Sequence, residues 1–94
     1  MRAPHALWVF GNHYYYGKGV ETDVAQAAAL YEEAAETGFP YALINLGVMY
    51  RNGEHFDVDL TRALECFDKA SPKSEHAALL ANELRQQLDS RSDV

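Results

Sequence analysis

Apolar and small residues recur along the chain with the spacing of an α-helix. From Leu7 to Tyr14 they occupy positions i, i+3, i+4 and i+7, which place their side chains on one helix face. A glycine-rich break, Gly17-Lys18-Gly19, follows this stretch. The helical spacing resumes from Ala27 to Ala34. The pattern therefore predicts two helices joined by a short loop.

The chain repeats itself when it is shifted by 36 positions. Between residues 4–38 and 40–74 the shift aligns nine identical pairs: Pro4/Pro40, Ala6/Ala42, Leu7/Leu43, Gly11/Gly47, Tyr14/Tyr50, Gly17/Gly53, Asp23/Asp59, Ala27/Ala63 and Ala34/Ala70. Similar residues align at Phe10/Leu46, Val20/Phe56, Val24/Leu60 and Tyr31/Phe67. A repeat of this length is typical of helical solenoids, in which each unit packs on its neighbours.

The ends of the predicted helices carry recognisable signals. Asp23, with Gln26 three positions later, is suited to cap the second helix. Pro4 and Pro40 stand where a first-turn proline removes no needed donor, and Gly38 suits a left-handed helix end. We expect the four repeat helices at about residues 4–16, 23–37, 40–52 and 59–70.

A last helix, at about residues 75–89, lacks the glycine and tyrosine of the repeat. Its apolar face, from Ala77 to Leu88, suits packing on the preceding helix, and its other face is polar, as at the end of a solenoid. The sequence thus predicts a single all-α domain over residues 1–94. We expect an α/α superhelix of two helix-turn-helix repeats, at about 4–38 and 40–74, followed by a C-terminal capping helix, with residues 90–94 frayed.

Small and large residues alternate within the repeat. Gly11 and Gly47 are expected to admit the neighbouring second helix at its alanines, because close packing needs small residues where helices approach. The large residues of the repeat are expected to fill the space between helix pairs: Tyr14, Tyr31, Tyr50 and Phe67.

Residues 6–23, ALWVFGNHYYYGKGVETD, followed by Ala27, Leu30, Tyr31, Ala34, Ala35 and Gly38, resemble the Sel-1-like repeat, a relative of the tetratricopeptide repeat. The second unit departs from this pattern where Glu54-His55-Phe56 replaces Lys18-Gly19-Val20 and where Ser74 replaces the closing glycine, which leaves its loop conformation open. The resemblance covers about residues 4–74. It implies a superhelix that acts as an adaptor or scaffold in protein complexes, with no catalytic residues to carry over.

Charge and cysteine content narrow the expected partners and location. Eight Lys and Arg against fourteen Asp and Glu give a net charge of −6, so we expect no nucleic-acid partner. The single cysteine, Cys66, cannot form an internal disulfide, which makes the cytoplasm the default location. The apolar run from Ala6 to Phe10 is too short for a signal-peptide core or a membrane span, although a chain whose leader had been removed would look the same. We expect no membrane partner.

The sequence predicts no catalytic, cofactor or metal site, and hence no enzyme. Gly17-Lys18-Gly19 lacks the Lys-Ser/Thr ending and the preceding strand of a phosphate-binding loop. Cys66 aligns with Leu30 and is expected to be buried in the core. The four histidines have neither an i, i+4 pair nor a companion cysteine and are expected at the surface. They are His5, His13, His55 and His76.

The remaining signal is aromatic. In the tetratricopeptide arrangement that the resemblance implies, the first helix of each unit lines a concave surface. Tryptophan, tyrosine and arginine are enriched at binding hot spots. We predict that a partner peptide or helix lies in a groove at Trp8, Asn12, Tyr15, Tyr16, Tyr41, Ile44, Val48 and Arg51. Trp8 and Ile44 could instead fill the core between the first helices.

Two functions stay open at this point. The leading hypothesis is a non-catalytic protein-interaction module that binds a protein or peptide partner in the groove. The alternative is a structural subunit that self-associates as a homo-oligomer or stacks within a larger assembly, because repeat arrays usually need about three units to bury a continuous core. His13 stands where the second unit has Met49, which indicates that the outer edge of the first helix meets water.

Overall fold

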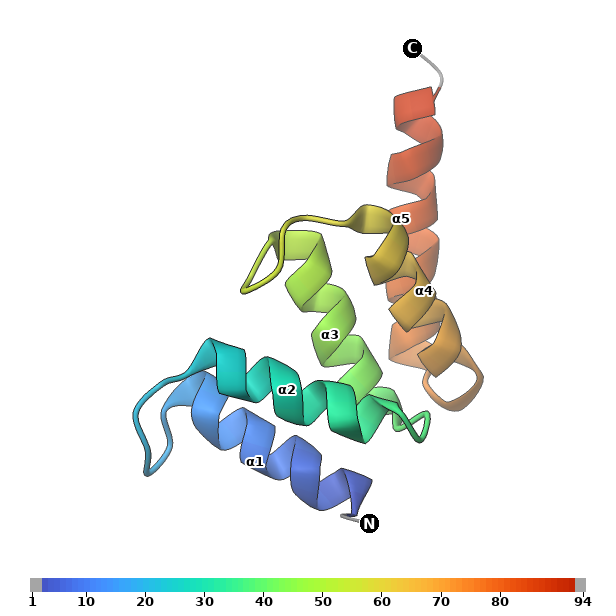
Figure 1. Cartoon of the computed structure of the whole chain (residues 1–94). Helices are drawn as coiled ribbons and strands as arrows, with labels where there is room; N and C mark the ends of the chain where they lie inside the picture. Colours follow the sequence, from blue (N-terminus) through green and yellow to red (C-terminus); the bar gives the residue numbers. More distant parts are fainter. Residues whose placement is uncertain (1–2, 93–94) are drawn as a thin grey trace.

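The computed structural model describes residues 3–92 of the chain, and within them five α-helices and one short 3-10 helix follow one another. They are α1 (Pro4–Tyr16), α2 (Val24–Ala35), α3 (Pro40–Asn52), α4 (Leu60–Ala70), η1 (Ser71–Lys73) and α5 (Glu75–Ser92). Helices α1 and α2 pack as one hairpin, α3 and α4 as a second, and α5 lies against α4 (Figure 1). The all-α superhelix of two hairpins and a capping helix is therefore confirmed.

The same end signals act in both hairpins. Helices α1 and α3 begin at a proline and end at left-handed glycines, Gly17 (φ 70°) and Gly53 (φ 73°). Asp23 and Asp59 each accept the backbone N–H of the residue three positions later, at 3.0 and 2.9 Å. Both aspartates are caps that precede their helices, so α2 and α4 start one residue later than predicted.

Two helix ends differ more from the prediction. Helix α2 ends at Ala35, before the expected residue 37, because the chain turns through Gly38 (φ 82°), whose N–H donates to the Ala35 carbonyl at 2.9 Å. Helix α5 runs to Ser92, so residues 90–92 are helical where fraying was expected, and residues 93–94 lie outside the described part. The last turns of α5 extend past the end of α4 (Figure 1).

The loop of the second hairpin keeps the shape of the first loop despite its different sequence. In both loops the N–H of the capping aspartate donates to a tyrosine carbonyl nine positions earlier, at 2.9 Å. Gly19 has φ 78°, and the aligned His55 has φ 66°. The second loop thus has the same conformation as the first, which the sequence left open. His55 adopts a left-handed backbone conformation there, which costs a non-glycine residue roughly 1 kcal/mol.

A glycine and an aromatic ring meet inside each hairpin. A Cβ at Gly11 would stand 2.6 Å from the Tyr31 ring, and a Cβ at Gly47 would stand 2.4 Å from the Phe67 ring. Both rings are fully buried. Each ring thus packs inside its own pair, where only glycine leaves room for it. Each ring also belongs to a buried cluster that includes residues of the next helix, α3 for Tyr31 and α5 for Phe67, in agreement with the expectation that these residues fill the space between helix pairs. The glycines therefore admit the second helix at these rings and not, as expected, at the repeat alanines. The alanines are fully buried: Ala27, Ala34, Ala63 and Ala70.

Helix α5 packs like the first helix of a further unit but carries polar residues where α3 has small or apolar ones. Its buried residues Ala77, Ala81 and Leu84 repeat, at a spacing of 35, those of α3: Ala42, Leu46 and Met49. The exposed Asn82 stands at the place of Gly47, so α5 offers no opening for the ring of another helix. Arg85 instead binds the Asp68 carboxylate of α4 at 2.6 Å. These polar residues fit a capping role.

Candidate functional site

Side chains of α1 and α3 enclose a pocket of about 190 Å³ between the two helices. It is lined by Tyr15, Tyr16, Ile44, Asn45, Val48 and Met49. Four of these residues belong to the predicted groove, whereas Asn45 and Met49 were not predicted. Met49 is almost fully buried, as expected of a residue that contacts the preceding helix.

Tyr15 is fixed in this pocket by a contact with the opposite hairpin. Its hydroxyl hydrogen-bonds to the carboxylate of Glu54, 39 positions later. This hydrogen bond, with smaller contributions from burial and the Glu54 charge, raises the pKa of Tyr15 to about 12. The Tyr15 ring packs edge-on against Tyr16 at 4.9 Å, and Tyr16 is 61% exposed. Tyr15, held by its hydrogen bond to Glu54, therefore packs against Tyr16, which faces solvent.

An aromatic cluster adjoins the pocket at the start of α3. The Trp8 ring lies 5.2 Å from Tyr41, 6.1 Å from Phe39 and 5.7 Å from His5, measured between ring centroids. The indole N–H of Trp8 donates to the Asn45 side-chain oxygen at 3.1 Å, which joins the cluster to the pocket. Trp8 is half-buried, whereas Tyr41 is 52% exposed. Phe39 was not predicted, and its repeat counterpart, an alanine, gave no signal for it.

Two of the other predicted groove residues, Asn12 and Arg51, do not line the pocket. Asn12 accepts a hydrogen bond from the Tyr31 hydroxyl at 2.6 Å, inside the first hairpin, and burial raises the pKa of Tyr31. Arg51 donates to the adjacent Asn52 side chain at 3.2 Å and does not line the pocket. Ile44 lines the pocket and also packs on the buried cluster where α3 meets α4 and α5. The structure thus brings half of the predicted residues into one pocket.

Cys66 lies at the edge of a different hollow, of about 420 Å³, between α2, α3 and α4. Core packing was expected from its alignment with Leu30: Cys66 does pack against the core cluster, but it is half-buried at the rim of this hollow, whereas Leu30 is 5% exposed. Burial raises the pKa of the Cys66 thiol, which keeps it protonated and a poor nucleophile.

The four histidines are exposed, as predicted: His5, His13, His55 and His76. Within residues 3–92 there is no group of three or more His, Cys, Asp or Glu side chains that could hold a metal ion. No helix in that same range is both long and apolar enough to cross a membrane.

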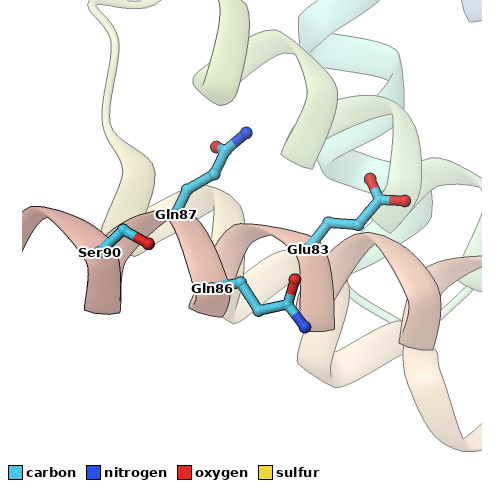
Figure 2. Close-up of a pocket in the computed structure, with 4 residues that line it drawn as sticks. All are labelled: Glu83, Gln86, Gln87 and Ser90. Carbon is cyan, nitrogen blue, oxygen red and sulfur yellow. The ribbon is translucent and has the colours of Figure 1, made fainter.

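A wider hollow of about 700 Å³ lies along α5 and is lined by Glu83, Gln86, Gln87 and Ser90 (Figure 2). The side chains of Glu83 and Gln87 extend to the same side of the helix (Figure 2). All four lining residues are polar and come from one helix, unlike the enclosed apolar pockets that bind small molecules. Glu83 aligns with Val48 in the spacing of 35, so the apolar surface of α3 gives way to a polar one on α5.

Comparisons with known proteins agree with this architecture. A family model described as Sel1 repeat matches residues 4–39 and 40–71. The Arabidopsis thaliana protein HRD3B, an ERAD-associated E3 ubiquitin-protein ligase component, is 40% identical over 66 residues, which cover 70% of this chain and 11% of HRD3B. The chain thus spans about a tenth of that relative's length.

Solved structures show the same fold. A protective antigen of uropathogenic Escherichia coli with an SLR fold superposes with a TM-score of 0.71 and 40% identity, over 74% of this chain and 15% of that one. A Sel1 repeat protein from Oxalobacter formigenes superposes with a TM-score of 0.79 and 26% identity, over 85% of this chain and 61% of that one. Because the family model spans both hairpins, the resemblance found in the sequence is confirmed, and the chain belongs to the Sel1 repeat family.

Proposed function

We propose that this protein is a non-catalytic adaptor or scaffold that holds a peptide or helix of a partner protein on the concave surface formed by α1 and α3. Sel1 repeat proteins typically mediate protein–protein interactions, and the related HRD3B is named as a component of a ligase assembly. The observation that carries the proposal is the apolar pocket between α1 and α3, flanked by exposed tyrosines.

The surface combines fixed and exposed aromatic residues. Hydrogen bonds from Trp8 to Asn45 and from Tyr15 to Glu54 hold α1 against α3, so a partner meets a surface that is already ordered. Preorganisation of this kind lowers the entropy cost of binding. Tyr16 and Tyr41 then offer contact area of the residue type that dominates binding hot spots.

The pocket also indicates the chemistry of the partner. Ile44, Val48 and Met49 form an apolar lining that suits one large apolar side chain. The net charge of −6 favours association with a neutral or basic segment over an acidic one. We therefore propose an apolar anchor residue within an uncharged or basic stretch as the bound element.

Affinity purification with mass spectrometry tests the proposal. The informative variant is Tyr16→Ala with Tyr41→Ala, because both side chains are more than half exposed and their loss leaves the internal hydrogen bonds intact. Val58→Ala, at a residue 60% exposed in the loop before α4, is the matched control. We expect proteins retained by the wild type and the control to be lost by the double variant. Equal retention by all three chains would refute the proposal.

Binding to the purified protein gives a direct second readout. Trp8 is the only tryptophan of the chain and lies in the aromatic cluster beside the pocket. A synthetic peptide from a retained partner should change the Trp8 fluorescence emission in a saturable titration. Saturable binding with no change in this emission would place the peptide away from α1 and α3.

A further inference from the structure

The hollow of about 420 Å³ between α2, α3 and α4 lies on the other side of α3 from the α1–α3 pocket. Leu46 and Tyr50 of the hollow each follow, by two positions, Ile44 and Val48 of the pocket. Two positions turn an α-helix by about 200°, so the two sets face opposite ways. We call this second depression the α2–α4 hollow, and it is separate from the surface proposed above.

The floor of the α2–α4 hollow is apolar. Leu43 and Leu46, which are 4% and 5% exposed, line it together with the half-buried Cys66. Its rim is charged, and helix α2 contributes the exposed carboxylates of Glu32 and Glu36 to it. An apolar floor inside a charged rim is the arrangement typical of protein interfaces.

The α4 side of the rim has the opposite charge. Helix α4 contributes two exposed positive side chains, Arg62 and Lys69, and one negative side chain, Glu65. Tyr50 holds Arg62 on this side, because the guanidinium lies 5.5 Å from the centre of the Tyr50 ring and donates to its hydroxyl at 3.5 Å. Within residues 3–92, no ion pair joins the two sides of the hollow. The α2 and α4 sides thus present opposite charges to an incoming group.

The second hairpin shows which group the acidic position of α2 accepts. Asp68 on α4 aligns with Glu32 in the 36-residue repeat, and Arg85 of the next helix binds its carboxylate at 2.6 Å. In the spacing of 35 that relates α5 to α3, Arg85 stands at the place of Tyr50, which contacts Arg62 instead. In the part of the chain that the structure describes, Glu32 therefore has no counterpart of the Asp68–Arg85 ion pair.

We propose that the α2–α4 hollow binds a segment of a second partner protein, in which a large apolar side chain enters the hollow, a basic side chain pairs with Glu32 and an acidic side chain faces Arg62. The basic side chain takes the place that Arg85 holds beside Asp68 in the second hairpin. A protein segment suits the hollow better than a small zwitterion does, because the charged rim is exposed and does not enclose a ligand. Since the two sites lie on opposite sides of α3, both can be occupied at once.

Selection from a phage-displayed library of random peptides tests the proposed chemistry. The library is first depleted on the Glu32→Lys, Glu36→Lys variant and then selected on the wild type, so that the retained peptides require the acidic side of the hollow. We expect these peptides to carry a basic and an acidic residue on either side of an apolar one. Retained peptides that lack a basic residue, or the absence of any retained peptide, would overturn the proposal.

Alkylation of Cys66, the single cysteine of the chain, locates a bound peptide. A synthetic copy of a retained peptide, at roughly ten times its Kd, should slow the reaction of Cys66 with N-ethylmaleimide about tenfold, because the peptide covers the half-buried thiol. An unchanged rate would place the peptide elsewhere and overturn the proposal. The Tyr16→Ala, Tyr41→Ala variant should show the same protection, since neither residue lines the hollow. This site and the α1–α3 surface can therefore fail independently.

Charge reversal on both molecules is the sharpest test, and its first arm needs no variant of the protein. Replacing the basic residue of the peptide by glutamate should weaken binding to the wild type about tenfold, and Glu32→Lys, Glu36→Lys should restore part of the loss. The matched control is Glu21→Lys, Asp57→Lys, which changes the net charge equally at two exposed loop residues and should bind the original peptide like the wild type. Equal weakening of the original peptide by both double variants would indicate a general charge effect and overturn the proposal.

Discussion

The two hairpins have the same backbone arrangement, but one buried contact is polar in the first and apolar in the second. In the first hairpin the Tyr31 hydroxyl donates to Asn12 at 2.6 Å. In the second, Phe67 replaces Tyr31 and Val48 replaces Asn12, so both the hydroxyl and its acceptor are absent. A buried hydroxyl needs a hydrogen-bond partner and a phenyl ring does not, so each hairpin holds a self-consistent pair.

This difference shapes the candidate binding surface. Asn12 directs its oxygen into the hairpin and leaves no apolar group for the pocket. Val48, with no hydroxyl to satisfy, lines the pocket together with Ile44. Because the second hairpin has no buried hydroxyl to satisfy, position 48 can be apolar and contribute to the lining of the pocket on α3, the surface proposed to bind a partner.

The glycine beneath each ring is the most sensitive point of this comparison. In Gly47→Ala the new Cβ would stand 2.4 Å from the Phe67 Cε1 atom and 2.8 Å from Cδ1, and the buried ring has no space to move into. We expect a loss of about 2–3 kcal/mol in the free energy of unfolding, after the helix-propensity gain of alanine. For a chain of this size the melting temperature should fall by roughly 10 °C or more.

Gly11→Ala provides the matched change in the first hairpin. Its Cβ would stand 2.6 Å from the Tyr31 ring, so its cost should be similar and slightly lower. Combining Gly47→Ala with Phe67→Leu should restore part of the loss, since the smaller side chain vacates the overlapped space, and the coupling is read from a double-mutant cycle. A Gly47→Ala protein that melts like the wild type would show that the ring is less confined than the structure indicates.

Asn12→Val tests the hydrogen bond between Tyr31 and Asn12, and we expect it to cause the second-largest loss of stability. The variant leaves the fully buried Tyr31 hydroxyl without its acceptor, and an unsatisfied buried hydroxyl costs about 1–3 kcal/mol. Tyr31→Phe alone should cost less, because the half-buried Asn12 reaches water. The midpoint of urea unfolding at constant m-value measures both effects.

The double variant Asn12→Val, Tyr31→Phe reproduces the pair found in the second hairpin. It should be more stable than the sum of the single changes predicts, since it removes the donor and the acceptor together. Strict additivity of the two changes would mean that the hydrogen bond contributes no coupling.

Alkaline pH should act on the first hairpin in particular. Burial raises the pKa of Tyr31, and the bond to Glu54 raises that of Tyr15 to about 12. An unfolded tyrosine has a pKa near 10, so the native state favours the protonated form, and stability is complete below pH 10 and falls as the pH rises above it. We expect a loss of roughly 1 kcal/mol by pH 11.

Tyr31→Phe should flatten this pH dependence, because the aligned residue of the second hairpin, Phe67, has no titrating group. The comparison is made on urea unfolding midpoints between pH 8 and pH 11. A pH profile of Tyr31→Phe that matches the wild type would show that Tyr31 titrates alike in the native and unfolded states, so that burial does not raise its pKa.

The sequence predicted what depends on neighbouring residues. Pro4, Pro40, Asp23 and Asp59 placed the starts of the helices to within one residue, since capping is a local interaction. The 36-residue repeat predicted the two hairpins, because each unit carries the same set of local helix signals. The family comparison confirms this part of the prediction.

Contacts between distant residues could not be predicted in this way. Helical spacing places Tyr31 on the inner side of α2 but does not say whether its ring points into its own hairpin or toward the next. The Tyr15–Glu54 and Trp8–Asn45 bonds join residues 39 and 37 positions apart, and they depend on the angle between α1 and α3. The pocket depends on such contacts, so only half of the residues predicted for the groove line it.

The loops offer the last and smallest test of the comparison. His55 holds φ 66° where the first loop has Gly19 at φ 78°, a conformation that favours glycine. His55→Gly should therefore raise the free energy of unfolding, but by less than about 1 kcal/mol, because glycine also gains freedom in the unfolded chain and the contact of the His55 ring with Phe56 is lost. Gly19→His should lower it by a similar amount. Thermal melts of His55→Gly and Gly19→His measure both changes. If the melting temperature shifted in the same direction in both variants, the two loops would not share one conformation in solution.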